Sequence, residues 1–367
     1  MSAFAAAAAM ATGSAAPASA DFDALIDPII QPILTSLTDS LAVFDPAAAL
    51  DLTSWTDSFL ASLNAIDLAL PSTADSAAAV AAAAEPAAAT GPFDLPLSME
   101  LGTEPAVNAS IASGPDVPLL VDTGSTGLVI PYTDLGDNWF TQLEGLFQLG
   151  FPNSFGESGY SGGVEYIYAT YNNVPVDYDG GLSTNGPVDV ELLSWPTSSG
   201  SPLSFQEFLA DNQVSGILGI GDNTAGPADA SPFESYGGVL VDIPEGKLIV
   251  DATNPLPSFA TVDGAPVSAL YESVNGGTPI AVINDIDSGG VWGTIPSSLA
   301  SSVPAGTTIE VYNGAGGPLL YSYTVGDDFG APAPVSGTDI DSGVAPYLLY
   351  PIYIDYANGN LYFDNLS

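Results

Sequence analysis

The spacing of hydrophobic residues divides the chain into parts of different texture. Over residues 21–71, apolar side chains recur about every fourth position, which is the period of an amphipathic helix. Pro28 and Pro32 interrupt the first turns, so the spacing predicts one helix after them and a second helix beginning near Asp51. We interpret this segment as a helical spacer, with a partner-binding helix pair as the alternative. Residues 72–92 hold little apolar material and predict a flexible linker.

From Phe93 onward the pattern changes to short Val-, Ile- and Tyr-rich runs that alternate with Gly, Pro, Asn and Asp. Residues 166–171 and 351–356 are two such runs, and each is typical of a strand. Asn358-Gly359 lies between two apolar runs and predicts a hairpin. No long helical period follows Phe93, so we expect the rest of the chain to form an all-β domain.

The charge of the chain is strongly negative. A single Lys or Arg residue stands against 43 Asp and Glu residues, which gives a formal net charge of −42. Such a chain repels phosphate, so we expect no nucleic acid partner and no docking on anionic lipid through a basic patch. Disorder does not follow, because 46% of the residues are hydrophobic. Most of the carboxylates are expected to be solvated at the surface.

Histidine and cysteine are absent from the chain, which excludes several kinds of chemistry. Without cysteine there is no disulfide, zinc–thiolate site or iron–sulfur cluster, and without either residue there is no Ser-His-Asp or Cys-His catalysis. An enzyme with this composition must use carboxylates, hydroxyls, backbone amides or an oxygen-bound metal. The acidic runs at 134–138 and 327–328 do not have the spacing of a calcium-binding loop. We therefore expect no metal and no cofactor.

Residues 1–20 are Ala-rich and end in Ala18-Ser19-Ala20, which is typical of an export signal with a small-residue cleavage site. The positive residues that usually begin such a signal are missing. No segment holds about 18 uninterrupted apolar residues, so no transmembrane helix is expected. We expect an exported protein, secreted or associated with the cell envelope, and the alternative is a low-complexity Ala-rich tail.

Residues 119–131 carry the most informative motif, in which Asp122-Thr123-Gly124-Ser125 joins two apolar runs. A buried strand can deliver one carboxylate to such a turn, a glycine lets another segment approach closely, and the Ser hydroxyl can donate to the carboxylate. This segment resembles the active-site segment of pepsin-like aspartic proteases. The resemblance implies that Asp122 is a catalytic aspartate supported by Thr123, Gly124 and Ser125.

The resemblance requires a second aspartate, because the family's mechanism uses two carboxylates that share one proton and one water. Asp287-Ser288-Gly289 follows an apolar run and repeats the aspartate–hydroxyl–glycine order. Asp341 begins the same pattern, but too few residues follow it to complete a lobe. We therefore assign the second catalytic role to Asp287, with Ser288 and Gly289 as support. Asp341 and Asp285 are the alternatives.

Weaker matches extend the resemblance over the whole β part of the chain. Residues 214–221 resemble the strand that packs behind the first aspartate, 236–254 resemble strands shared by the lobes, and 353–364 resemble the last hairpin. The resemblance implies a mostly β, bilobal pepsin-like fold. Its first lobe would span 93–255, and a shortened second lobe would span 256–367.

Two positions depart from the pepsin pattern. Gly290 stands where a Ser or Thr is usual, so Asp287 lacks the hydroxyl that Ser125 offers to Asp122. A hydrogen bond to the ionised form lowers a pKa, so we expect Asp122 to be ionised and Asp287 to hold the shared proton. The second departure is Leu-Leu-Tyr at 348–350, where the pattern predicts a glycine after the apolar pair.

A protease of this class also needs a hairpin that closes over the substrate. Residues 157–164 place a Gly-rich tip between two potential strands, and Tyr160 is our candidate for the aromatic residue of this flap. The alternative is an ordinary hairpin tyrosine, one of 16 in the chain.

The export-like start, the helical linker and the acidic, cysteine-free domain together resemble the mycobacterial PE-family aspartic proteases. The resemblance implies an aspartic endopeptidase, which we expect to be monomeric. Because the surrounding negative charge raises carboxyl pKa values and the two aspartates share one proton, we expect a mildly acidic optimum. Its substrates would be peptides or proteins, among them other exported proteins or its own linker at 72–92. One alternative is a catalytically inactive protease-like surface domain used for binding, which Gly290 and the short second lobe favour. A carboxylate glycosidase is the other, but it does not explain a hydroxyl and a glycine after each aspartate.

Overall fold

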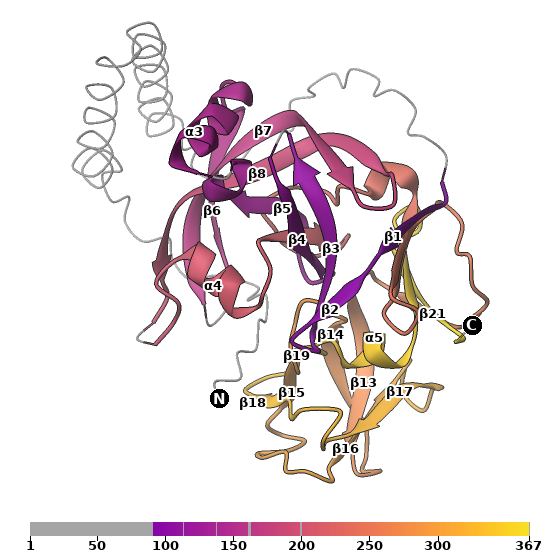
Figure 1. Ribbon diagram of the computed structural model, residues 1–367. Coiled ribbons are helices and arrows are strands. Elements are labelled where there is room, and N and C mark those ends of the chain that lie inside the picture. The colour runs from indigo at the N-terminus through magenta and orange to yellow at the C-terminus, as the bar shows by residue number, and fades with distance from the viewer. Residues whose placement is uncertain (1–90, 113, 137, 161–162, 199, 367) are drawn as a thin grey trace, which may run out of the picture. The chain divides into compact units, whose positions relative to one another are not determined.

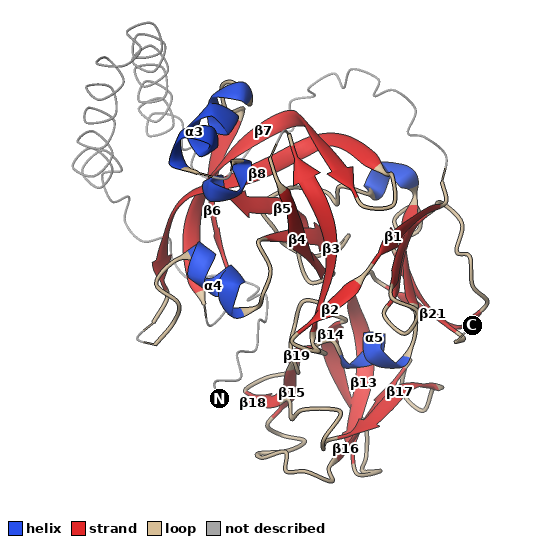
Figure 2. Cartoon of the chain, viewed as in Figure 1, coloured by secondary structure: helices blue, strands red, loops and turns tan. Residues whose placement is uncertain are grey.

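The computed structural model describes residues 91–366 except 113, 137, 161–162 and 199. The predicted export segment, the helical segment and the linker up to residue 90 lie outside the described residues. The described part consists mainly of strands with a few short helices (Figure 2), so the expected β character is confirmed. None of the helices in this part is long and apolar enough to cross a membrane.

An eight-stranded sheet holds the first aspartate motif (Figure 1). In spatial order its strands are β2 (Ser98–Glu100), β3 (Glu104–Ile111), β4 (Asp116–Asp122), β9 (Gly216–Ile220), β5 (Thr126–Pro131), β8 (Ser183–Pro196), β7 (Val164–Tyr178) and β6 (Ser154–Gly159). Strand β3 pairs with β7 as well as with β4, so the sheet closes on itself.

The central strands of this sheet form because they are apolar on both faces. Every residue of β5 and β9 is buried, as are the last four residues of β4. Continuous apolar runs of this kind are typical of strands covered on both sides. Strand β9 lies between β4 and β5, parallel to the first and antiparallel to the second. The strand predicted from residues 214–221 is therefore present as β9, and the turn after Asp122 crosses over its end.

A six-stranded antiparallel sheet combines strands from distant parts of the chain. Its order is β1 (Phe93–Pro96), β11 (Lys247–Val250), β10 (Gly238–Asp242), β20 (Ile352–Asp355), β21 (Asn360–Asp364) and β12 (Ser258–Asp263). The predicted hairpin at Asn358-Gly359 is confirmed, because it joins β20 to β21. The connection is longer than the two residues expected, since Asp355 pairs with Asn360.

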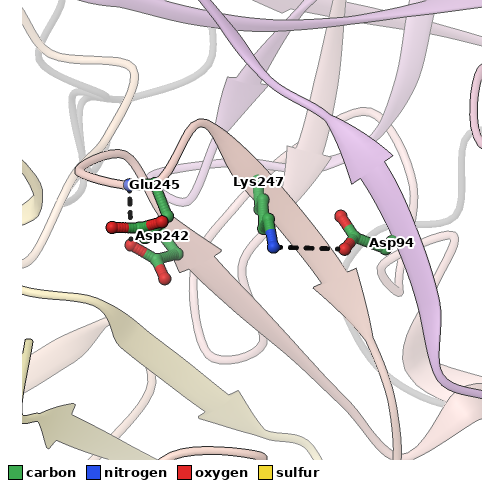
Figure 3. Close-up of polar contacts among 4 residues, drawn as sticks. All are labelled: Asp94, Asp242, Glu245 and Lys247. Carbon is green, nitrogen blue, oxygen red and sulfur yellow. Dashed lines mark hydrogen bonds and ion pairs between the residues drawn. The ribbon is translucent and has the colours of Figure 1, made fainter. Parts of the chain in front are cut away.

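The one basic side chain of the sequence, Lys247, lies in this sheet. Its Nζ is 3.5 Å from Asp94 Oδ2 on β1, while Asp242 accepts a hydrogen bond from the backbone of Glu245 nearby (Figure 3). Both side chains of the ion pair are about half exposed, and such pairs stabilise a fold by no more than about 1 kcal/mol. The burial of apolar strands, and not charge pairing, therefore holds this acidic domain together.

A five-stranded sheet holds the second aspartate motif. Its order is β17 (Leu319–Thr324), β16 (Thr308–Tyr312), β13 (Val267–Val274), β14 (Ile280–Asp285) and β19 (Asp339–Asp341), and a separate pair consists of β15 (Thr294–Pro296) and β18 (Ala333–Val335). Strands β14 and β19 are parallel, with Asp285 opposite Asp341. The repeated aspartate–hydroxyl–glycine segments of the sequence therefore lie beside each other.

The helices are short, and two of them differ from the sequence analysis. They are η1 (Tyr132–Leu135), α3 (Trp139–Gln148), α4 (Phe205–Asp211), η2 (Glu234–Tyr236) and α5 (Ala345–Leu349). Helix α3 forms where no helix was expected. Helix α5 occupies the Leu-Leu-Tyr segment that was compared with a strand, because Pro346 fits the first turn of a helix and Gly343 ends the strand before it. The strand beside β14 is β19 instead.

Candidate active site

The first turn presents Asp122 at the end of a buried strand. Asp122 is the last residue of β4 and is 6% exposed, while Thr123 and Ser125 in the turn are also buried. In the register of the sheet, Asp122 lies opposite Gly219 of β9. A Cβ atom at Gly219 would lie 2.8 Å from Ser125 Oγ, so glycine is the residue that lets this turn fold over β9.

The second turn presents Asp287 in a similar way. Strand β14 ends at Asp285, and the chain continues through the buried Ile286 to Asp287, which is 3% exposed. The backbone N–H of Asp287 donates to Ser342 Oγ at 3.0 Å, which ties this turn to the segment after β19. The turn is therefore held from its own sheet as well as from the opposite turn.

Reciprocal hydrogen bonds join the two turns. Thr123 Oγ1 donates to the carbonyl of Ile286 at 2.8 Å and accepts from the N–H of Ser288 at 2.8 Å. Ser288 Oγ donates to the carbonyl of Val121 at 2.6 Å and accepts from the N–H of Thr123 at 3.1 Å. All four hydrogen bonds lie in a buried setting, where such bonds hold geometry most firmly. The hydroxyl residue after each aspartate thus fixes the partner turn.

The same turns bring the two carboxyl groups together. The N–H of Gly124 donates to Asp122 Oδ1 at 2.9 Å and to Asp287 Oδ1 at 3.1 Å. The N–H of Gly289 donates to Asp287 Oδ1 at 2.8 Å. A Cβ atom at Gly124 would lie 2.6 Å from Asp287 Cγ, and one at Gly289 would lie 2.6 Å from Asp122 Oδ1. Each carboxyl therefore rests against the glycine of the opposite turn.

The surroundings make the two carboxyls unequal. Burial raises the pKa of Asp122, but hydrogen bonds from Ser125, from Asp287 and from backbone amides act against this. The bond from Ser125 Oγ to Asp122 Oδ2 measures 2.5 Å. Burial raises the pKa of Asp287 much further, and the negative charges of Asp341, Asp122 and Asp285 add to the effect. These surroundings favour protonation of Asp287 over protonation of Asp122.

Tyr160, the expected flap residue, lies near the two carboxyls without being part of the pair. Tyr160 follows β6 at the start of the turn to β7 and is 9% exposed, so it is packed in the core of the eight-stranded sheet. Its ring stacks on Phe208 and Phe205 at centroid distances of 5.6 and 6.2 Å. The negative charge of Asp122 contributes to raising the pKa of Tyr160, so this side chain lies within electrostatic reach of the site.

Two residues of the site were missed by the sequence analysis. Tyr347 of α5 is fully buried, and its hydroxyl lies 3.1 Å from Thr123 Oγ1 and 3.0 Å from the carbonyl of Ile286. Asp341 was weighed only as a rival to Asp287, whereas it lies beside Asp287, close to Gly290. No local pattern indicates either contact, because both depend on how the end of the chain packs.

The structure combines a closed β-sheet with two aspartate–hydroxyl–glycine turns that hydrogen-bond to each other. These features define an aspartyl peptidase-like domain. Residues 93–361 match the family model described as the PE-PGRS C-terminal aspartyl peptidase-like domain, and the chain belongs to this family. It is 39% identical over 285 residues to PE cleavage protein A of Mycobacterium tuberculosis and 38% identical over 286 residues to PE cleavage protein A of Mycobacterium marinum. The alignments cover 72% of this chain and 50% of each relative, so the chain spans about half the length of the curated relatives it matches.

Proposed function

We propose that this protein is an aspartic endopeptidase that hydrolyses peptide bonds with a water molecule activated between Asp122 and Asp287. The observation that carries the proposal is the N–H of Gly124, which donates to both carboxyls and so fixes them face to face. Two buried carboxyls held in this way are most stable when they share one proton. A single shared proton makes one of them a base and the other an acid.

The unequal surroundings assign the two roles. Ionised Asp122 takes a proton from the water as that water attacks the scissile carbonyl, while protonated Asp287 polarises the carbonyl oxygen. Asp287 passes its proton to this oxygen, which gives a tetrahedral diol. The proton that Asp122 removed then passes to the leaving nitrogen as the C–N bond breaks, and a diol hydroxyl returns a proton to Asp287 as the new carboxyl group forms. The reaction proceeds without a covalent acyl-enzyme. Both aspartates belong to one chain, so a monomer is sufficient for this chemistry.

The proposal includes a pepsin-like arrangement of two lobes, with the substrate extended between them. The reciprocal bonds of Thr123 and Ser288 support it, because they join a turn of the eight-stranded sheet to a turn of the five-stranded sheet. An extended peptide places alternate side chains on opposite faces, which suits apolar subsites on either side of the catalytic pair. We assign the hairpin between β6 and β7 to the flap that covers this peptide, with the buried Tyr160 anchoring its base.

The substrates we propose are exported proteins. Two relatives carry the name PE cleavage protein A, which supports cleavage of PE proteins, and the linker at 72–92 of this chain is a further candidate. The proposed location is outside the cytoplasm, either secreted or at the cell envelope. Fractionation of mycobacterial cells that express the chain with a C-terminal tag tests the location directly.

Cleavage by the full chain tests the proposed activity. The wild type and Asp122→Asn are incubated at mildly acidic pH with a library of extended peptides and with the isolated 72–92 peptide. We expect wild-type cleavage that pepstatin inhibits and that a chelator leaves unchanged, and no cleavage by the variant. Equal results for the two proteins would support the alternative, a catalytically inactive domain used for binding.

A further inference from the structure

One oxygen of the catalytic pair lacks the hydrogen bond that its counterpart receives. Asp122 Oδ2 accepts from Ser125 Oγ at 2.5 Å. Asp287 Oδ1 accepts from the amides of Gly124 and Gly289, but no hydroxyl of its own turn is placed as Ser125 is for Asp122. The residue three positions after Asp287 is Gly290, which has no side chain to offer.

A third carboxyl fills the space that a side chain at position 290 would take. A Cβ atom on Gly290 would lie 2.9 Å from Asp287 Oδ2, 2.9 Å from Asp341 Oδ1 and 3.0 Å from Asp341 Oδ2. These distances are shorter than van der Waals contact, so a serine at 290 and the carboxyl of Asp341 compete for one place. Asp287 Oδ2 and both oxygens of Asp341 thus lie within 3.0 Å of one point, the place of the missing Cβ.

The Asp341 carboxyl is held in position but not fully satisfied. It is 5% exposed, and Oδ1 accepts from the N–H of Gly343 at 2.6 Å. Oδ2 is buried and has no hydrogen-bond partner among the residues that the structure describes. An ionised carboxylate with an unpaired oxygen is costly to bury, whereas a protonated carboxyl has an O–H to donate. Burial raises the pKa of Asp341 to about 7, so it is protonated at mildly acidic pH.

We propose that Asp341 is a positioning residue whose protonated carboxyl donates to Asp287 Oδ2, in place of the hydroxyl that Ser125 provides for Asp122. The proposal rests on the proposed function, since it assigns Asp341 a role in orienting a catalytic aspartate. The donor reaches the site from β19, a different strand from the one that leads to Asp287. Gly290 is then required so that this carboxyl can fit.

Several titratable groups surround Asp341, and each of them affects the pH at which Asp341 ionises. Asp285 faces it from the paired strand β14, and Asp287 and Asp122 lie in the two turns. The negative charges of Asp341 and of Glu272 on β13 also raise the pKa values of two tyrosines of β17, Tyr321 and Tyr323. A test that depends on one pH profile alone is therefore insufficient, and a rescue experiment is needed.

Rescue between positions 290 and 341 tests the placement of the donor. Four full-length proteins are compared: the wild type, Asp341→Ala, Gly290→Ser and the double variant. We expect Asp341→Ala to lower kcat about ten- to a hundredfold, the effect of one lost hydrogen bond to a carboxyl that gains negative charge as it protonates the carbonyl oxygen, with little change in KM. Gly290→Ser alone loses activity because its Cβ meets Asp341. The double variant, in which the serine hydroxyl has room, should regain at least tenfold over Asp341→Ala.

A double variant no more active than Asp341→Ala would overturn the proposal, as would wild-type kcat in Asp341→Ala. Asp341→Asn adds a readout that a merely structural role would not move. The amide still donates but cannot ionise, so the negative charge that Asp341 acquires near pH 7, and that raises the pKa of Asp287, is gone. We therefore expect the alkaline limb of kcat to move to lower pH by about half a unit or more. An unmoved limb contradicts the role.

Thermal unfolding of the same four proteins separates this inference from the proposed function. If positions 290 and 341 share one space, the double variant is more stable than the sum of the two single effects predicts, whether or not the protein cleaves anything. Should wild type and Asp122→Asn prove equally inactive, the proposed function falls and unfolding alone decides. Additive unfolding temperatures would then reject the placement of Asp341, and coupled ones would support it.

Discussion

The two aspartate turns share their outer bonds but differ in what lies behind them. In the first turn, Leu120 of β4 lies opposite Ile217 of β9, two residues before Asp122. In the second, Asp285 of β14 lies opposite Asp341 of β19, two residues before Asp287. A buried apolar pair thus lies behind Asp122, and a pair of carboxyls lies behind Asp287.

This difference explains how two turns joined by nearly symmetric hydrogen bonds can hold one carboxyl that acts as a base and one that acts as an acid in the proposed reaction. Ser125 stabilises the ionised form of Asp122, whereas the neighbours of Asp287 are acids that favour its protonated form. The backbone makes the turns alike, whereas Ser125 in the first turn and Asp341 beside the second make them unequal. Substitutions at matching positions of the two turns therefore test how far the two carboxyls differ.

The largest effect is expected from removing the base. Asp122→Asn keeps the shape of the side chain and accepts the bond from Gly124, but it cannot take a proton. We expect kcat to fall about a hundred- to ten-thousandfold with the unfolding temperature little changed. Steady-state cleavage of one peptide measures the loss, and Asp327→Asn, an exposed carboxyl outside the site, is the matched control.

The next effect concerns the two glycines that face the carboxyls. Gly124→Ala and Gly289→Ala each insert a methyl group at 2.6 Å from an atom of the opposite carboxyl. Both should destabilise the protein by about 1–3 kcal/mol and reduce kcat, because the carboxyls must separate. Chemical denaturation of both variants measures the cost. A large effect at one glycine and none at the other would show that the turns do not face each other.

Ser125→Ala removes the donor that distinguishes the first turn. The pKa of Asp122 should rise, because a bond that favours its ionised form is lost. The acidic limb of kcat/KM reports protonation of the base, so it should move to higher pH, with a rate loss of about tenfold at the optimum. A profile that keeps the wild-type acidic limb contradicts the assignment of Asp122 as base.

A smaller effect is expected from a buried acid of the five-stranded sheet, Glu272. Burial raises its pKa to about 8 in the folded protein, from the 4.5 of an exposed glutamate. The folded state then binds a proton that the unfolded state has lost, so stability is greatest below pH 4.5 for this group and falls as the pH rises towards 8. Wild-type Tm should fall by about 5 °C or more between pH 5 and 8. Glu272→Gln should reduce this slope, and the exposed control Asp327→Asn should not.

The sequence was most informative where function is encoded by adjacent residues. Strand character, both aspartate turns and the strand behind Asp122 follow from local patterns, because a buried strand and a glycine turn each leave a signature of a few residues. Helix α3 and the strand that supports Asp287 do not. The segment Asp339–Asp341 is short and polar, and only its pairing with β14 makes it a strand.

The proposed role of Asp341 shows what sequence patterns do not reveal. Its motif repeats that of Asp287, so the sequence presents it as a rival, and its contact with the space at Gly290 arises from tertiary packing alone. Tyr347 is similar, because its hydroxyl reaches Thr123 only after α5 has formed. Residues that act through contacts between distant segments leave no local pattern to be read.

The most direct test of the account is the comparison of kcat/KM for Asp287→Asn and Asp341→Asn, measured on the same peptide at the same mildly acidic pH. Asparagine preserves the size of both side chains, so the two variants differ in which carboxyl is lost. The account predicts a loss of about a hundredfold or more for Asp287→Asn and of less than about tenfold for Asp341→Asn. The opposite order would mean that Asp341 is the partner of Asp122, and the pairing described above would be wrong.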